Sequence, residues 1–250
     1  MNPILESLYQ RRSVRAFQER PVPEELKRAI LDAAAQAPSA GCQQLYTILD
    51  ISDQSLKEAL AVSCDEQPFI AKAPVVLVFC ADCLKWFDAY VEAGCTPRQP
   101  LAGDLMLAVD DAVIAAQNAV VAAQSLGLGS CYIGDIMENY EEHKKLLNLP
   151  DYAFPVAMLC MGYYPENYQK RLNPRFKREY VVFKDNYKRL NNDEIKDMFK
   201  SLDESYKEKN NYNAKNYAQT HYARKTGAPF AREMARSVRE ALKVWNGKKG

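Results

Sequence analysis

Histidine is scarce in this chain of 250 residues, which has only His143 and His221. One Cys-x-x-Cys motif, from Cys80 to Cys83, has no second copy, so the spacing expected of a zinc site is missing. The seven cysteines are an odd number scattered through apolar segments, which favours buried reduced thiols over a disulfide framework. We therefore expect no metal site.

Glycine-rich phosphate-binding motifs are also missing. No Gly-x-Gly-x-x-Gly follows a predicted strand and no Gly-x-x-x-x-Gly-Lys occurs, so a Rossmann dinucleotide site and a P-loop are unsupported. The N-terminus lacks a basic region followed by an apolar run, so we expect no secretory signal and a cytoplasmic protein.

Charge of one sign does not dominate, since 33 basic and 32 acidic residues give a net charge of +1. That balance provides no general attraction to nucleic acid or to a membrane, and we expect neither as a partner. Residues 201–250 are basic, with eleven Lys or Arg against five acids. Nucleic-acid binding by this segment is the weakest of three functional hypotheses. It predicts salt-dependent binding that is lost on removing the residues after about 205.

The most apolar stretch, residues 105–128, contains Asp110, Asp111 and Gln117. These polar groups favour a helix buried in the core or at a subunit interface over a membrane span.

Strands and helices alternate in the pattern up to about Tyr164, which predicts a layered α/β domain. Residues 83–103 fit either a mobile, substrate-facing element or a packed surface helix. Beyond Tyr164 we expect a strand at 180–183 and a basic amphipathic helix at 229–245. In the region before Tyr164, we expect strands at 45–51, 74–80, 130–134 and 154–162. In the same region we expect helices at 24–37, 53–64, 105–128 and 138–147.

The basic turn Arg11-Arg12-Ser13-Val14-Arg15 is the most informative feature. It follows a stretch in which Ile4, Leu5 and Leu8 share one helical face. Arginine grips phosphate oxygens two at a time, so the turn predicts a phosphorylated cofactor, against the alternative of solvated surface charge.

Several further features occur in a specific order. They are Phe17 after the basic turn, the loop Ala37-Pro38-Ser39 with Gln44 beyond it, the pair Gln117-Asn118, the run Ser125 to Gly129 leading into Tyr132-Ile133-Gly134, and the late basic pair Lys170-Arg171. In this order and spacing the chain resembles the FMN-dependent nitroreductase family, in particular its oxygen-insensitive NADPH nitroreductases and NADPH-flavin reductases. The resemblance extends from Leu5 to about Arg171.

The resemblance implies an α+β fold, a three-layer sandwich with a central mixed sheet, in an intertwined homodimer with FMN at the subunit interface. It implies one domain over residues 1–250. The core would occupy about 1–164, and a C-terminal extension, about 165–250, would pack on the partner subunit.

The resemblance also assigns roles at the phosphate end of the flavin. Arg11, Arg12 and Ser13 would hold the FMN phosphate and ribityl chain. Arg15 would lie at the N1 and O2 edge of the ring, where a guanidinium stabilises the negative charge of the reduced flavin, and is the candidate catalytic residue. Arg171, with Lys170, would form a second clamp on the phosphate.

Other residues would contact the ring itself. Gln67 would hydrogen-bond the pyrimidine edge, and the backbone of Tyr132, Ile133 and Gly134 would pack against the ring. Ser39 would contact the flavin of the facing subunit.

Three positions depart from the family pattern. Ala40 and Cys42 replace a serine and an asparagine, so side-chain hydrogen bonds to the flavin are lost there. Asp135 stands where relatives often have glycine, and an acid so close makes the flavin harder to reduce. Lys170 and Arg171 are adjacent rather than separated by one residue, so one of them reaches the phosphate.

The function implied is ping-pong electron transfer from NADPH or NADH, through FMN, to nitroaromatics, quinones or flavins. Lys215, Arg224 and Lys225 are candidates for binding the 2′-phosphate of NADPH, or are part of a solvated basic tail. The alternative function is a non-catalytic FMN-binding protein for storage or sensing, which the changes at Ala40, Cys42 and Asp135 would allow.

Overall fold

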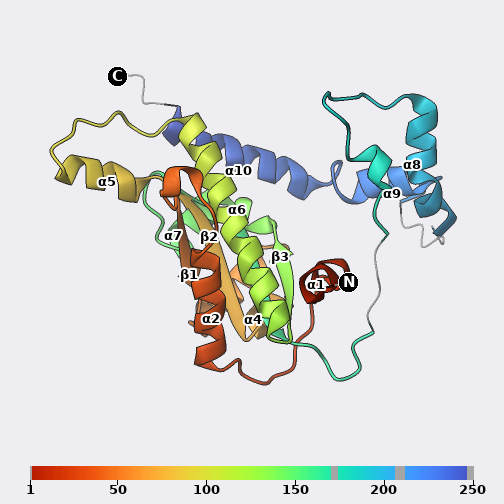
Figure 1. The fold of residues 1–250 in the computed structure, drawn as a ribbon, viewed down its shortest axis with the longest axis horizontal. Helices are drawn as coiled ribbons and strands as arrows, with labels where there is room; N and C mark the ends of the chain where they lie inside the picture. Colours follow the sequence, from red (N-terminus) through yellow and green to blue (C-terminus); the bar gives the residue numbers. More distant parts are fainter. Residues whose placement is uncertain (1, 170–173, 206–211, 247–250) are drawn as a thin grey trace. The chain divides into compact units, whose positions relative to one another are not determined.

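Four strands form one sheet in the order β1-β2-β4-β3, and neighbouring strands are antiparallel. The structure, a computed structural model, describes residues 2–169, 174–205 and 212–246 (Figure 1). The strands are β1 (Tyr46–Asp50), β2 (Val75–Asp82), β3 (Leu128–Ile133) and β4 (Ala153–Tyr163). All four were predicted from their apolar runs.

The sheet has a hydrophobic core on each face, because side chains alternate along its central strands. Leu77 and Phe79 of β2 lie in one core, whereas Val76 and Val78 lie in the other. Helices cover both faces, which gives the predicted three-layer α+β sandwich.

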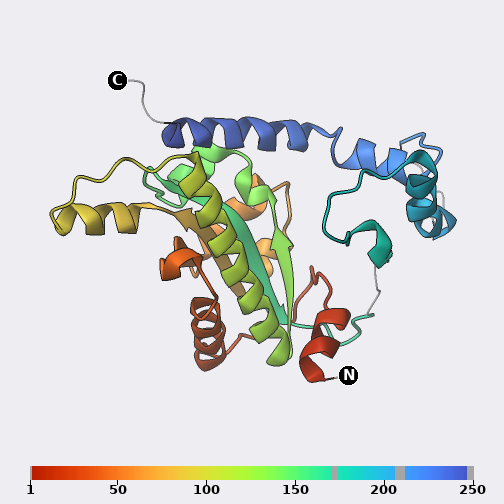
Figure 2. The same cartoon turned by 45° about the horizontal axis from the view of Figure 1, so that its top comes forward.

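The first core contains α2 (Glu24–Ala35) and α6 (Ala102–Ser125), and α6 crosses that face of the sheet in both views (Figures 1 and 2). The second contains α3 (Gln54–Ser63), α4 (Phe69–Lys72) and the 3₁₀ turn η2 (Asp135–Met137). The remaining elements of this region are α1 (Pro3–Gln10), η1 (Ala40–Cys42), α5 (Leu84–Glu92) and α7 (Tyr140–Leu146).

Helix α6 is long and apolar enough to cross a membrane by length and composition alone. Its alanine-rich face is buried, with Ala108, Ala112 and Ala116 fully covered in the first core. Asp111 is also buried and accepts two backbone hydrogen bonds. These contacts are those of a core helix of the folded domain, one of the two locations that the sequence favours.

One expectation is corrected. No strand forms at 180–183, where the 3₁₀ turn η3 (Arg178–Tyr180) leads into an irregular segment with Val181 60% and Val182 56% exposed. β-branched residues favour a strand only where a sheet receives them. The helix indicated before the basic turn forms as α1, and its apolar residues Ile4, Leu5 and Leu8 are exposed.

The described chain divides into two compact units, one of residues 1–170 with 233–250 and the other of residues 171–232. The second unit contains α8 (Asn192–Ser205) and α9 (Tyr217–Arg224). Its aromatic contacts join Phe199 to Phe176 and Tyr217. The predicted division into a core and an extension stays a prediction.

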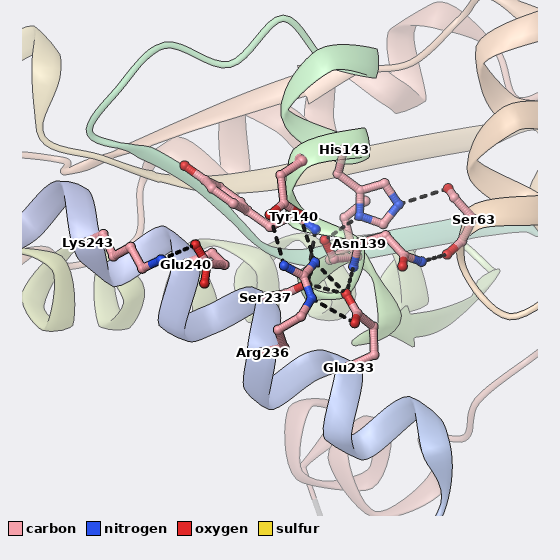
Figure 3. Close-up of polar contacts among 11 residues, drawn as sticks. Ser63, Asn139, Tyr140, His143, Glu233, Arg236, Ser237, Glu240 and Lys243 are labelled. Atoms are coloured by element: carbon pink, nitrogen blue, oxygen red, sulfur yellow. Dashed lines mark hydrogen bonds and ion pairs between the residues drawn. The ribbon is translucent and has the colours of Figure 1, made fainter.

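Helix α10 (Pro229–Trp245), predicted as an amphipathic helix, returns to the first unit. Ser237, Ala241 and Trp245 are buried there, and Ser237 Oγ accepts a 3.0 Å hydrogen bond from the Tyr140 amide. Arg236 forms ion pairs with Glu233 at 2.8 Å and Glu141 at 2.7 Å, and Figure 3 shows its contact with Glu233. Apolar burial and this ion-pair cluster together fix α10 against α7.

Candidate functional site

Packing of Val14 places the basic turn at the edge of the sheet. The Val14 amide donates a 2.9 Å hydrogen bond to the Ser130 carbonyl, and Ser13 forms a parallel bridge with Ser130. This is an isolated parallel bridge outside the named strands, whose own pairings in the described part of the chain are antiparallel. Val14 is fully buried, whereas Ser13 and Arg15 on either side are exposed. Burial of one valine therefore turns the neighbouring polar side chains outward.

The arginines of the turn are not neutralised by acids. Within the described residues, Arg11, Arg12 and Arg15 form no ion pair. Arg12 donates from Nη1 to the Gln10 carbonyl, while its Nε is buried and has no partner in this part of the chain. A buried N–H without an acceptor is costly, so the turn is well suited to an anion such as a phosphate.

The end of β3 lies beside this turn, because Ser130 belongs to the same strand as Tyr132 and Ile133. Burial raises the pKa of Tyr132 to about 12, an effect that nearby Arg11 opposes. Gly134 is exposed, and a Cβ at its position would meet nothing within 4 Å. The backbone there is open to a flat ligand.

Gln67 reaches the same end of β3 from the loop after α3. Its Nε2 lies 2.7 Å from Asp135 Oδ2 and 2.7 Å from the Cys64 carbonyl oxygen. Asp135 follows Gly134 directly, so the acid that departs from the family pattern contacts a predicted flavin ligand. Burial raises the pKa of the neighbouring Cys131 thiol, while Arg15 and Arg11 act in the opposite direction.

An open groove of about 900 Å³ begins at Arg15. Phe17 and Phe69 supply apolar walls, and Lys57 and Lys72 supply positive charge. Lys57 is buried and donates to the Ala73 carbonyl at 3.2 Å, and this burial lowers its pKa. The lining also includes Glu19 and Glu24, so basic residues outnumber acids around Arg15 without being alone there.

Ser39 lies apart from the basic turn and the end of β3 within one chain. It precedes β1, which is one edge strand of the sheet, whereas the basic turn lies on β3 at the opposite edge. This separation agrees with a role toward the facing subunit, which stays a prediction. Lys170 and Arg171 lie outside the described residues.

The Ser39 loop is held by Asp111, a residue whose role the sequence did not reveal. Its carboxylate accepts hydrogen bonds from the amides of Ala40 at 2.8 Å and Leu45 at 3.0 Å. The available signal was an acid on the buried face of an alanine-rich helix. Glu138 was also missed, because it is the first residue of the helix predicted at 138–147, and an acid in the first turn is ordinary for a helix.

Residues 83–103 contain helix α5, which packs beside the same loop. Trp86 Nε1 donates a 2.6 Å hydrogen bond to the backbone carbonyl of Gln43. The side-chain Nε2 of Gln43 donates to the Tyr90 hydroxyl at 3.2 Å. With Arg98 and Phe87 these residues line a cavity of about 430 Å³. Helix α5 has no buried residue and borders this cavity, so the choice between a mobile, substrate-facing element and a packed surface helix stays open.

Comparison with known proteins matches residues 8–163 to the nitroreductase family, a range that contains the basic turn, Gln67 and the end of β3. The chain is 35% identical over 185 residues to an oxygen-insensitive NADPH nitroreductase of Salmonella typhimurium, covering 74% of this chain and 75% of the relative. It is 31% identical over 183 residues to an FMN reductase [NAD(P)H] of Bacillus subtilis, covering 72% and 73%.

Solved structures resemble nearly the whole chain. The structure of NfrA2 from B. megaterium superposes with a TM-score of 0.86 at 29% identity, covering 99% of both chains. NfrA1 nitroreductase from B. subtilis superposes with a TM-score of 0.85 at 25% identity, covering 99% of this chain and 100% of the other.

Proposed function

Because the chain belongs to the nitroreductase family, we propose that it is an FMN-containing oxidoreductase that takes electrons from NAD(P)H and passes them to nitroaromatics, quinones or flavins. The observation that carries this proposal is the basic turn at the edge of β3, whose arginines form no ion pair with any described residue and where the buried Nε of Arg12 has no hydrogen-bond partner among those residues. The reaction is ping-pong, with the reductant leaving before the acceptor enters.

The residues fit FMN by their chemistry. Arg11, Arg12 and Ser13 hold the phosphate and ribityl chain, with charge-assisted donors that no acid competes for. The open backbone at Gly134 admits the flat ring. Arg171, with Lys170 next to it in the sequence, would supply the second clamp, with one of the two reaching the phosphate.

FMN held by these residues would supply two-electron redox chemistry between the nicotinamide and the acceptor. Arg15 acts on the N1 and O2 edge, where its fixed positive charge stabilises the electron-rich form. Gln67 orients the pyrimidine edge by hydrogen bonding. The chain therefore contributes position and electrostatics rather than an acid, base or nucleophile.

The assembly we propose is a homodimer whose facing subunit supplies Ser39. Helix α6 exposes Met106, Leu107, Val113 and Ile114 on the side away from the sheet. A row of exposed apolar side chains favours a protein interface. We assign residues 1–250 to one domain, with residues 165–250 as the extension and a cytoplasmic location.

A second function, storage or sensing of FMN without turnover, is favoured by one observation. Asp135 lies in hydrogen-bonding contact with Gln67, so a negative charge stands near the ring and opposes its reduction. Arg15 opposes that effect, which is why we place reduction first.

Anaerobic titration with NADPH separates the two functions. A reductase binds FMN, loses its visible flavin bands stoichiometrically, and regains them when a nitroaromatic or quinone is added. Bound flavin that neither NADPH nor NADH bleaches would support storage or sensing. A purified chain that does not bind added FMN would contradict both.

A further inference from the structure

Asp135 determines which way the Gln67 amide faces. The amide nitrogen has two hydrogens, and its two acceptors are Asp135 Oδ2 and the Cys64 carbonyl, each at 2.7 Å. A rotated amide would place its oxygen against these two oxygens, which is repulsive. Gln67 Oε1 is thereby fixed as the group that remains to accept a hydrogen bond.

Glu138 lies next to Asp135 in an unusual state for an acid. Its side chain is buried, with the residue 3% exposed, and Oε1 has no hydrogen-bond partner among the described residues. The 3₁₀ turn places Glu138 three residues after Asp135, with the Glu138 amide 2.9 Å from the Asp135 carbonyl oxygen. Burial, and next the charge of Asp135, raise the pKa of Glu138 to about 7. A proton between the two carboxyls would satisfy both observations.

The backbone around Glu138 prevents the side chain from turning out to solvent. The Glu138 amide donates to the Asp135 carbonyl at 2.9 Å. The next residue, Asn139, has a left-handed backbone and donates from Nδ2 to the Ser63 carbonyl at 2.9 Å. His143 contacts both the Ile136 carbonyl and Ser63 Oγ (Figure 3). The 3₁₀ turn and the start of α7 are thus held to α3 on both sides of Glu138.

We propose that Asp135 and Glu138 are positioning residues that share one proton, with Asp135 orienting Gln67 toward the flavin and Glu138 holding the pair at a single negative charge. This inference rests on the proposed function, because Gln67 meets the pyrimidine edge only when FMN is bound. Loss of the shared proton doubles the negative charge beside that edge and makes reduction harder.

Titratable groups on several neighbouring elements surround the carboxyl groups of Asp135 and Glu138. Asp65, after α3, and Glu233, on α10, both disfavour ionisation of Glu138. Glu233 is itself paired with Arg236. Burial lowers the pKa of His143 on α7, which favours the neutral imidazole. Arg11 and Arg15 lie across β3, near Cys131. Added protons therefore have one favourable location here, between the two carboxyls.

The test is the midpoint potential of the bound flavin from about pH 5.5 to about pH 8.5, a range that brackets neutrality. Glu138→Gln keeps the size of the side chain and removes the titrating group, and Asp135→Asn removes the partner. Glu66→Gln is the matched control, since Glu66 is exposed in the same loop as Gln67.

The wild type and Glu66→Gln are expected to show an extra fall in potential through neutral pH that both pair variants lack. The ratio of the affinity for reduced FMN to the affinity for oxidised FMN should fall with rising pH in both proteins. Over the range tested, it should fall roughly threefold to tenfold more in the wild type than in Glu138→Gln. Parallel potential curves for wild type and Glu138→Gln would overturn the inference while leaving the reductase intact.

Infrared titration of the flavin-free protein gives a readout that does not depend on activity. A protonated carboxyl band that disappears through neutral pH, and is missing in Glu138→Gln, supports the shared proton. A wild type without such a band would overturn the inference. Failure to bind FMN would instead overturn the proposed function, with the infrared band still deciding whether the pair shares a proton.

Discussion

The amide of Val14 donates a 2.9 Å hydrogen bond to the carbonyl of Ser130, and this contact joins the basic turn to β3. Gly129 allows the approach, since a Cβ there would lie 2.7 Å from Val14 Cγ2 and 3.0 Å from Val14 Cβ. The position of the three arginines therefore depends on the absence of one methyl group.

Gly129→Ala is expected to displace the turn and weaken FMN binding by about tenfold, with a loss of unfolding free energy of about 1–3 kcal/mol. Flavin fluorescence titration and urea unfolding measure the two effects. Gly103→Ala is the control, because a Cβ at Gly103 meets nothing within 4 Å. Equal FMN affinity in Gly129→Ala and Gly103→Ala would contradict the role of this packing contact.

Arg15 is predicted to act on reduction more than on binding. Arg15→Gln should lower the rate of flavin reduction by NADPH by tenfold or more, by analogy with the loss of a preorganised donor to a developing negative charge. Affinity for FMN should change much less, because the phosphate clamp stays. Arg20→Gln is the control, since Arg20 lines the same groove but stacks on Tyr163 at 4.1 Å. Stopped-flow absorbance measures the rates, and an unchanged rate in Arg15→Gln would be evidence against this role.

Asp111 is predicted to hold the Ser39 loop. In Asp111→Asn, one of the two amides of Ala40 and Leu45 would face an NH₂ group instead of an oxygen, at a cost of about 1–3 kcal/mol. Hydrogen exchange at Ala40 and Leu45 should accelerate, and the unfolding midpoint should fall. The neighbouring Asp110 is exposed, so Asp110→Asn should stay within about 0.5 kcal/mol of the wild type. Equal exchange rates in the two variants would rule out this role for Asp111.

Strands and core helices were predictable because their apolar patterns are local. The alternating residues of β2 and β4 meet two separate cores, and each run reads as a buried strand without knowledge of its partners. Val181 and Val182 show where local pattern fails. Their β-branched side chains favour a strand, but no neighbouring strand pairs with them among the described residues.

The candidate site was predictable where the family pattern supplied it and not where long-range packing did. Arg11 and Tyr132 belong to the ordered motifs, and the role of Gln67 is implied by the resemblance that those motifs carry. All three roles stay predictions. The contact between Gln67 and Asp135 joins residues 68 positions apart, and the acidic environment of Glu138 is assembled from three separate elements. A single sequence has no signal for such pairings, because burial of an acid depends on what the fold places around it.

The exposed face of α6 is predicted to form the dimer interface. Ile114 is 41% exposed beside Val113 and Met106, so Ile114→Glu would place a charge in an apolar contact. We expect the variant to sediment as a monomer, or to dissociate at least tenfold more readily. Glu58→Lys, on the exposed side of α3 over the other face of the sheet, should leave the dimer intact. A wild-type monomer at micromolar concentration would contradict the proposed assembly.

His143 is predicted to make stability depend on pH. It is fully buried, with Nδ1 2.9 Å from the Ile136 carbonyl and Nε2 2.8 Å from Ser63 Oγ. A carbonyl only accepts, so Nδ1 carries the hydrogen and Nε2 accepts from the serine hydroxyl. Protonation of Nε2 would force the Ser63 hydroxyl to turn from donor to acceptor. Burial also lowers the pKa of His143.

The unfolded chain then takes up a proton near the ordinary histidine pKa of about 6.5, while the folded chain takes it up at lower pH. Stability from His143 is therefore present above about pH 6.5 and is lost as pH falls below it, by at most about 1.4 kcal/mol per pH unit.

Urea unfolding from about pH 5 to about pH 8 should show His143→Asn less stable at the upper end and closer to wild type at the lower end. Glu138 acts in the opposite direction, because its raised pKa favours the folded state below neutral pH. It is common to both proteins and cancels in the difference. The exposed His221 gives the control His221→Asn, and a gap between wild type and His143→Asn that stayed constant with pH would show that His143 contributes packing alone.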